Sequence, residues 1–125
     1  MNGLIFIAMI FFHIVDDYYL QGWLASSKQK EWWQTNAPDP LYKHDYLMAL
    51  FMHSFSWTCS IMVVPTIYVF TTGGSLYPAL CMFIVNVLMH MFVDNLKANK
   101  KLINLITDQC LHLNQIFWTW FCLIL

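Results

Sequence analysis

Ionisable side chains recur at helical spacing within segments that are otherwise apolar. His90, Asp94 and Lys97 follow one another at steps of four and three residues, after an uncharged run that begins at Leu76. On a helix these three side chains project from one face. Imidazole and carboxylate groups are usual ligands of zinc, manganese and iron. The spacing therefore favours a metal site inside an apolar helix, which offers two ligands from one face.

The other apolar segments carry polar side chains of the same kind. The first and the last each hold a histidine and an aspartate four residues apart, and the second holds His53, with His44 as an open alternative. Counted from the lysine-bearing ends of the segments, five of these side chains lie about six to ten residues in, in a layer roughly 9 to 15 Å deep: Asp17, His53, His90, Asp108 and His112. The predicted metal ligands are His13, Asp17, His53, His90, Asp94, Asp108 and His112.

Two further residues are predicted to act on a substrate. Asp16 is the predicted general base, and Lys97 is predicted to stabilise an anionic substrate electrostatically. The histidines and aspartates exceed what one four-coordinate ion needs, so we expect two metal ions, or one ion with supporting residues. The expected cofactor is a divalent metal, with zinc or manganese favoured. Two such ions would activate water and clamp a phosphate or similar oxyanion.

The composition indicates that lipid surrounds the chain. Of 125 residues, 59% are hydrophobic and 10% are charged, whereas about 25% of an ordinary soluble domain is charged. There is no basic tract for nucleic acid. The four cysteines stand singly in apolar runs, as packing residues do. The N-terminal apolar run has no basic residue before it and no small-residue cleavage site after it, so we expect it to remain as a first span.

Four apolar segments are long enough to cross a bilayer, which takes about 20 helical residues. Short connections between them predict antiparallel neighbours. We therefore expect an all-α fold, an integral membrane four-helix bundle with antiparallel up-down topology, in one domain that covers residues 1–125. The predicted spans are residues 3–25, 44–70, 76–98 and 102–125.

The lysines predict the orientation of these spans. All six basic residues are lysines in or beside the first and third connections, and the second connection and both termini have none. By the positive-inside rule the lysines face the cytoplasm, so both termini lie on the outer side of a bacterial inner membrane. Lys43, Lys97, Lys100 and Lys101 could also steer a phosphorylated substrate or bind anionic lipid. A homo-oligomer is compatible with the aromatic-rich faces, although no G-x-x-x-G motif supports one.

The order of these motifs resembles a known family. H-x-x-D-D-x-x-L-Q from residue 13 to 21 is followed by Trp23 with Lys28, then by His44, then by H-x-x-x-D-x-x-K from 90 to 97 and D-Q-x-L-H from 108 to 112. The chain resembles, over nearly its whole length, domain of unknown function family 3307, which comprises small multi-span membrane proteins of bacteria and phages. The resemblance implies a helical membrane protein with a His and Asp signature, in which His44 is the second-segment histidine, and it implies no activity. A looser similarity, of residue types and topology, is to inner-membrane metal-dependent hydrolases.

Three functions compete on the sequence alone. The first is a metal-dependent hydrolase that opens to the cytoplasm and acts on a phosphorylated or lipid-linked substrate. The second is a proton or metal-ion channel or transporter, because intramembrane aspartates and histidines also form relays. The outer halves of the predicted spans hold almost no ionisable residue, which disfavours a path through the bilayer. The third is a phage or host membrane factor without enzymatic activity, in which the metal is structural.

Overall fold

The structure is all-helical. The computed structural model describes residues 1–125 and contains helices without any strand, which confirms the predicted all-α class. The long helices are α1 (Asn2–Val15), its π-helical continuation η1 (Asp16–Leu20), α4 (Asp45–Thr71), α5 (Tyr77–Ala98) and α6 (Leu105–Ile124). The short ones are α2 (Leu24–Ser27), α3 (Lys30–Asn36) and the 3₁₀ turn η2 (Pro40–Tyr42), all in the connection between η1 and α4.

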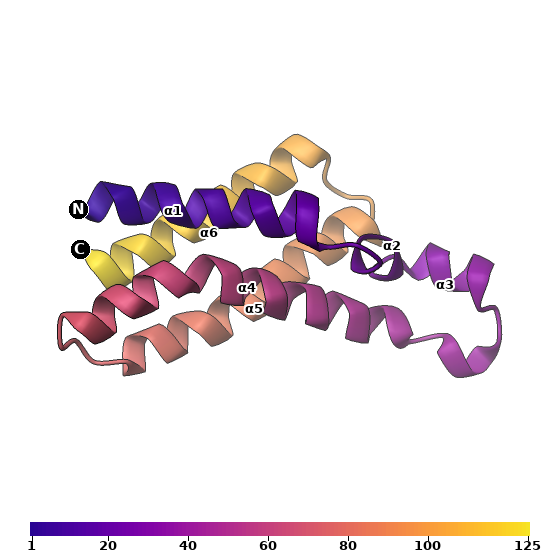
Figure 1. Cartoon of the computed structure of the whole chain (residues 1–125). Coiled ribbons are helices and arrows are strands. Elements are labelled where there is room, and N and C mark those ends of the chain that lie inside the picture. The colour runs from indigo at the N-terminus through magenta and orange to yellow at the C-terminus, as the bar shows by residue number, and fades with distance from the viewer.

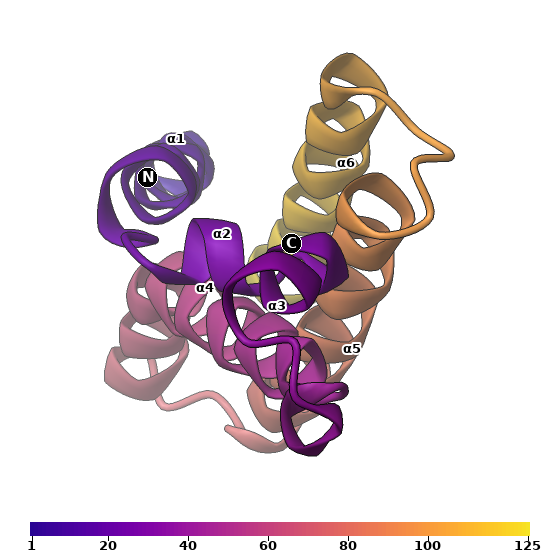
Figure 2. The ribbon, with the colours of Figure 1, turned by 90° about the vertical axis from the view of Figure 1, so that its right-hand side faces the viewer.

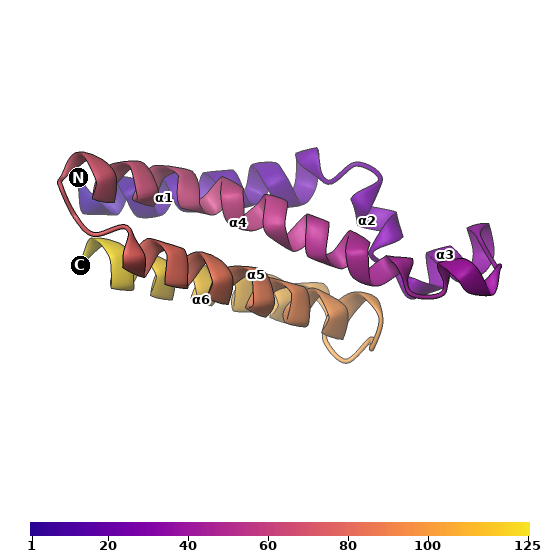
Figure 3. The same cartoon turned by 90° about the horizontal axis from the view of Figure 1, so that it is seen from below.

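The long helices lie alongside one another and reverse direction at each connection. Both termini and the turn between α4 and α5 lie at one end, whereas α2, α3 and the connection between α5 and α6 lie at the other (Figures 1 and 3). We call the latter the lysine end, because it carries all six lysines. Helix α4 packs against α1 and α5, and α6 packs against α5 and α1. Each long helix therefore turns one face toward the others.

Three helical segments are long and apolar enough to cross a membrane. They are Asn2–Leu20, Pro40–Thr71 and Tyr77–Ala98. Helix α6 is the remaining predicted span and has 20 residues. Its first half carries Asp108, Gln109 and His112 and so lowers its mean hydropathy. Membrane-length helices are thus present, and their polar residues gather in particular stretches.

Two predicted spans differ from the helices at the lysine end. The first helix ends at Leu20, five residues before the predicted limit, because Gly22 adopts a positive φ of 49° and turns the chain toward α2. Helix α6 begins at Leu105, not at residue 102, and the Asn104 side chain caps it by accepting a hydrogen bond from the Thr107 N–H at 2.9 Å. A helix cap and one glycine determine where these helices begin and end, whereas the predicted limits followed the length of the apolar segments, which does not depend on either feature.

The interior is as polar as it is apolar. Hydrophobic residues and polar or charged residues are equally numerous among the buried side chains. The apolar part lies toward the end that carries the termini, in a core cluster of Ile5, Met9, Trp57, Ile61, Met62, Ala79, Ile116 and Ile124. Large apolar side chains are exposed along the outside of every long helix. A soluble protein rarely leaves so much contiguous apolar surface uncovered.

The connection between η1 and α4 folds back over the end of α5. The Asn99 side chain holds it at two points: its Nδ2 donates to the Lys28 carbonyl at 3.1 Å, and its Oδ1 accepts from the Lys30 N–H at 2.6 Å. On the surface, Lys101 pairs with Glu31 at 2.9 Å, and this ammonium holds the pKa of the Glu31 carboxyl below its usual value. These contacts bring the backbone at Lys28 against α5 and direct its side chain inward.

We expect Gly22→Ala to destabilise the protein by about 1 kcal/mol, the usual cost of a left-handed conformation for a residue with a Cβ. No atom lies within 4 Å of the added Cβ, so the effect is one of backbone strain and not of a clash. SDS-induced unfolding in detergent measures it. Gly3→Ala is the matched control, since Gly3 has equally open surroundings and lies within α1, where alanine is expected to be neutral or stabilising. Equal unfolding curves for the two variants would contradict this account.

Candidate functional site

Six ionisable side chains from four helical elements meet in the interior. They come from η1, α4, α5 and α6, and each side chain is at most 6% exposed. We call this group the histidine–aspartate cluster. Its members are Asp17, His53, His90, Asp94, Asp108 and His112. The i, i+4 spacing within α5 and within α6 puts two members of each helix on its inner face, as predicted from the sequence.

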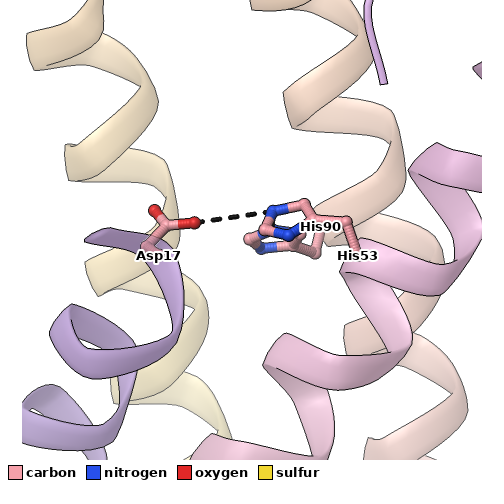
Figure 4. A group of neighbouring side chains, drawn as sticks. All are labelled: Asp17, His53 and His90. Atoms are coloured by element: carbon pink, nitrogen blue, oxygen red, sulfur yellow. Dashed lines mark hydrogen bonds and ion pairs between the residues drawn. The ribbon is translucent and has the colours of Figure 1, made fainter. Parts of the chain in front are cut away.

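One half of the cluster centres on His53. Its Nε2 lies 3.0 Å from His90 Nε2, 3.1 Å from Asp94 Oδ2 and 3.5 Å from Asp17 Oδ1. Figure 4 shows Asp17, His53 and His90 pointing toward one another from three separate helices. Two imidazole nitrogens at 3.0 Å either share a hydrogen bond or direct both lone pairs at one cation. Two carboxylates beside them favour positive charge at this point.

The other half centres on Asp94 and His112. His112 Nε2 lies 3.3 Å from Asp94 Oδ1 and 3.4 Å from Asp108 Oδ1, and His90 Nε2 lies 3.8 Å from Asp94 Oδ2. The rings of His90 and His112 are stacked with centroids 4.2 Å apart, and the Trp57 ring also stacks on His90, with centroids 4.1 Å apart. This stack holds the ring planes and directs both Nε2 atoms toward the carboxylates.

The cluster has the ligand chemistry and spacing of a divalent metal site. Asp17, His53 and His90 form one group, and His90, Asp94 and His112 another, in which the potential ligand atoms all lie within 4.8 Å of one another. Zinc ligands at about 2.0 to 2.2 Å in tetrahedral geometry are roughly 3.3 to 3.6 Å apart. The contacts of 3.3 and 3.5 Å match that spacing. The two groups share His90. Because one imidazole nitrogen binds one ion, His90 can serve only one of the two groups at a time.

The Nδ1 atoms of the three clustered histidines depart from the usual pattern of metal sites. The Nδ1 atoms of His53, His90 and His112 are buried without a hydrogen-bond partner. In most metal sites that nitrogen donates to a carboxylate or a carbonyl, which fixes the ring. Here the Trp57 stack supplies part of that orientation. Asp108 Oδ1 is also buried without a hydrogen bond and so remains available to a cation.

Lys28 is a member of the site that the sequence interpretation missed. Its side chain is 8% exposed, and its Nζ lies 2.6 Å from Asp94 Oδ2. In the sequence, Lys28 is one of several lysines in a polar connection, and the positions of these lysines indicate that they determine membrane topology. The only signal was its place in the Trp23 and Lys28 motif, and the structure supplies the fold-back that buries it. Lys28 and Lys97, which lies 2.5 Å from Asp108 Oδ2, offset two of the three clustered carboxylates.

His13 has partners other than the predicted metal. Its Nδ1 accepts from Trp57 Nε1 at 2.8 Å, so its proton is on Nε2 and donates to Gln109 Oε1 at 3.1 Å. The Gln109 amide then donates to Asp17 Oδ2 at 3.2 Å and to Asp108 Oδ2 at 3.0 Å. Both nitrogens of His13 are thereby committed, and His13 is not in either potential metal group. These contacts favour a positioning role for His13, which orients Gln109 between two carboxylates.

The chain matches one known family over nearly its whole length. Residues 5–124 match the family described as protein of unknown function (DUF3307). The chain belongs to the DUF3307 family. No curated protein and no solved structure matched the chain. The resemblance stated from the motifs is therefore confirmed at the level of the family.

The motifs that carry the resemblance can be placed on the structure. The H-x-x-D-D-x-x-L-Q segment makes the end of α1 and all of η1, and D-Q-x-L-H supplies Asp108, Gln109 and His112 from one face of α6. His44 is exposed at the start of α4, whereas His53 is 1% exposed within the cluster. Position therefore favours His53 over His44 as the second-segment histidine of the cluster.

The two predicted catalytic residues occupy different surroundings. Asp16 is buried, and its Oδ1 accepts hydrogen bonds from Ser56 at 2.8 Å and Ser60 at 3.0 Å. No hydrogen bond or ion pair joins Asp16 to the cluster, since consecutive residues of a helix point in different directions. Lys97 borders the cluster through Asp108. The contacts of Asp16 do not favour the predicted role of general base.

A pocket of about 420 Å³ gives access to the cluster from the lysine end. It lies between η1, α2, α5 and α6. Asp17, Gln109, Lys28 and Lys97 line it and thereby connect it with the buried groups. Beyond the cluster, Asn86 donates to Thr119 at 2.9 Å and accepts from Gln115 at 2.8 Å, and after this network the apolar core cluster begins. The cluster therefore opens toward the lysine end, and the apolar core lies between it and the other end.

We expect Lys28→Met to destabilise the protein by about 3 to 5 kcal/mol, because it leaves the Asp94 carboxylate buried without its ammonium partner. SDS-induced unfolding measures the loss. Lys43→Met is the control, since Lys43 is exposed and makes no ion pair, and we expect a change within about 0.5 kcal/mol. Adding Asp94→Asn to Lys28→Met removes the unpaired charge and is expected to recover part of the stability. An unaltered Lys28→Met protein would show that the pair contributes little.

Proposed function

We propose that the chain is a multi-span protein of the bacterial inner membrane, in which α1 with η1, α4, α5 and α6 form an antiparallel four-helix bundle. Three membrane-length apolar segments and the exposed apolar side chains on their outer faces support this. Helix α6 is the fourth span, because its polar residues face the cluster and its outward residues include exposed Phe117, Trp118 and Phe121. The lysine end faces the cytoplasm.

Within this bundle we propose a divalent metal site formed by the histidine–aspartate cluster. The observation that carries it is the convergence of three buried imidazole Nε2 atoms on buried carboxylates at ligand spacing. With neutral imidazoles, three carboxylates and the ammoniums of Lys28 and Lys97 leave one net negative charge, which a cation offsets. Zinc and manganese suit this mixture of nitrogen and oxygen ligands. The overlap of the two groups at His90 favours one ion, with a second as the alternative.

The activity that we propose is metal-dependent hydrolysis of a phosphate-containing substrate. A divalent ion in such a site activates water and polarises a phosphoryl oxygen. The pocket brings a substrate to Asp17, the cluster carboxylate that lines it, and the Lys97 ammonium on its wall attracts the phosphate. Asp17 replaces Asp16 as the proposed proton acceptor, because Asp16 does not line the pocket and already accepts from two serines.

The channel or transporter alternative receives less support. A path through the bilayer needs polar groups or water along the whole bundle. The polar groups continue from the cluster to Asn86, Gln115 and Thr119, and then the packed apolar side chains of Met9, Ile61 and Ile116 follow. A membrane factor with a purely structural metal, or with a proton on one imidazole in place of a metal, remains the second candidate. The unpartnered Nδ1 atoms favour it, because they lack the supporting hydrogen bonds of known metal sites.

Metal analysis of the detergent-purified protein tests the site. We expect wild type to retain about one equivalent of zinc or manganese after dialysis and His90→Gln to retain less than a tenth, because ligand loss weakens binding strongly. His44→Gln is the control, as the same substitution of an exposed histidine. Release of phosphate from a phosphate monoester is then compared between metal-loaded and chelated protein. An equal metal content in wild type and His90→Gln would refute the metal site and favour a polar network in which a proton on one imidazole replaces the metal. A metal-loaded protein that releases no phosphate would favour a structural metal.

Fusions test the orientation. An alkaline phosphatase placed after Leu125 is expected to be active, because the C-terminus lies on the outer side, whereas a fluorescent protein at the same position is expected to be dark. Insertion after Ala37, in the connection at the lysine end, is expected to give the opposite pair of results. Activity of the phosphatase at Ala37 alone would reverse the proposed orientation. Activity at both sites would contradict the four-span arrangement.

A further inference from the structure

The pocket at the lysine end has one cationic side and one apolar flank. Its cationic side is lined by Lys28 from the connection before α3, Lys97 from α5 and Lys101 from the connection between α5 and α6. Tyr18 of η1 and Leu105 of α6 line it on another side and are 56% and 55% exposed. Beyond them, Tyr19 and Ile106 extend the apolar surface on the outside of the same helices and are 78% and 74% exposed. In a membrane protein, this flank meets lipid.

The flank exists because α1 and α6 pack closely only at their other ends. There, Phe6 packs against Phe117 and Trp120, and Trp120 Nε1 donates to the Asn2 carbonyl at 2.9 Å. Toward the lysine end, the hydrogen bonds of Gln109 are the link between the two helices. Figure 2 looks onto that end and shows α1 well apart from the N-terminal part of α6. The pocket lies between η1 and the start of α6, in the space that this separation leaves.

The lysines in the pocket retain hydrogen-bonding capacity for an anion. Lys28 and Lys97 each donate one hydrogen bond, to Asp94 and to Asp108 respectively. An ammonium has three donors, so two on each remain for other acceptors. Phosphate oxygens accept such charge-assisted hydrogen bonds well. A pocket of about 420 Å³ falls within the usual range for small-molecule sites, about 300 to 1,000 Å³.

From this arrangement we propose that the ligand of the pocket is the phosphate monoester headgroup of a membrane lipid, which enters sideways between Tyr18 and Leu105. The headgroup lies among the lysines, and the acyl chains remain in the bilayer along the outer faces of η1 and α6. A soluble phosphate ester uses only the cationic side, whereas a lipid uses both. This inference rests on the proposed function for its chemistry, since it names the substrate class of that site, but binding alone can be measured without turnover.

Native mass spectrometry of the protein from phosphatidylcholine nanodiscs containing phosphatidic acid tests the proposal. We expect wild type to retain phosphatidic acid at least tenfold above its share of the lipid. Lys97→Gln is expected to lower retention about tenfold, as removal of a charge-assisted hydrogen bond does. Lys101→Gln, at a 68% exposed side chain that does not risk folding, is expected to lower it two- to threefold. Lys43→Gln, outside this pocket, is the matched control and is expected to change nothing.

The apolar flank has its own pair of variants. Leu105→Gln puts an amide on the wall of the pocket, and we expect it to lower phosphatidic acid retention about fivefold. Ile106→Gln is the neighbouring control, because Ile106 is more exposed and does not line the pocket. Glycerol phosphate, added as a soluble competitor, is expected to displace the lipid only at a hundredfold or greater excess. Each of three results would overturn the proposal. They are retention of phosphatidic acid in proportion to its share of the lipid, equal effects of Leu105→Gln and Ile106→Gln, and displacement of the lipid by a small excess of glycerol phosphate.

The measurements are made with metal and with chelator, which separates this inference from the proposed function. Selective retention of phosphatidic acid without metal binding or hydrolysis would support the lipid site and refute the hydrolase. Hydrolysis of glycerol phosphate by metal-loaded protein without lipid selectivity would support the hydrolase and refute the lipid site.

Discussion

The arrangement of the interior depends on the pairing of one buried carboxylate. Asp94 lies on the inner face of α5 and receives Lys28 from the folded-back connection, His53 from α4 and His112 from α6. A carboxylate removed from water must be paired or hydrogen-bonded, and the cost of leaving it alone is several kcal/mol. Its three partners come from parts of the chain that are distant in sequence. The contacts that pair the Asp94 carboxylate therefore hold the connection between η1 and α4 against three long helices, α4, α5 and α6.

A second set of contacts supports the cluster without joining it. Trp57 both stacks on His90 and donates to His13, and His13 in turn orients the Gln109 amide between Asp17 and Asp108. Every hydrogen-bonding side-chain nitrogen and oxygen of Trp57, His13 and Gln109 has a partner in this series. The positions of the Asp17 and Asp108 carboxylates therefore depend on the indole ring of Trp57. Such satisfied polar networks specify a single arrangement of a core, whereas partly satisfied ones are costly. The unpartnered Nδ1 atoms lie on the three clustered histidines, whose Nε2 atoms would bind the proposed cation.

The polarity of the bundle is distributed in a way that suits a site open to one side. Apolar side chains cover the outside of the long helices and close the end near the termini, while the polar groups lie inside and reach the surface through the pocket at the lysine end. In lipid, the outer surface needs no polar cover, and the driving force for packing comes from van der Waals contact and interhelical hydrogen bonds. The cluster thus serves packing and, in our proposal, chemistry with the same side chains.

Helical periodicity is a local property, so the sequence by itself determined the helices, the i, i+4 pairs and their common layer. It correctly indicated that Asp17, His53, His90, Asp94, Asp108 and His112 lie at similar depth. Which of those groups touch, and what else joins them, depends on helix rotation and on chain reversals that no local pattern encodes. Only the tertiary structure buried Lys28 against Asp94, committed His13 to Trp57 and Gln109, turned Asp16 toward α4 and left His44 outside. The first three outcomes follow from contacts between residues 40 or more positions apart, and the last from the exposure of His44 in the folded chain. Buried charged groups must be paired, and the partners that pair them are set by the fold and not by proximity in the sequence.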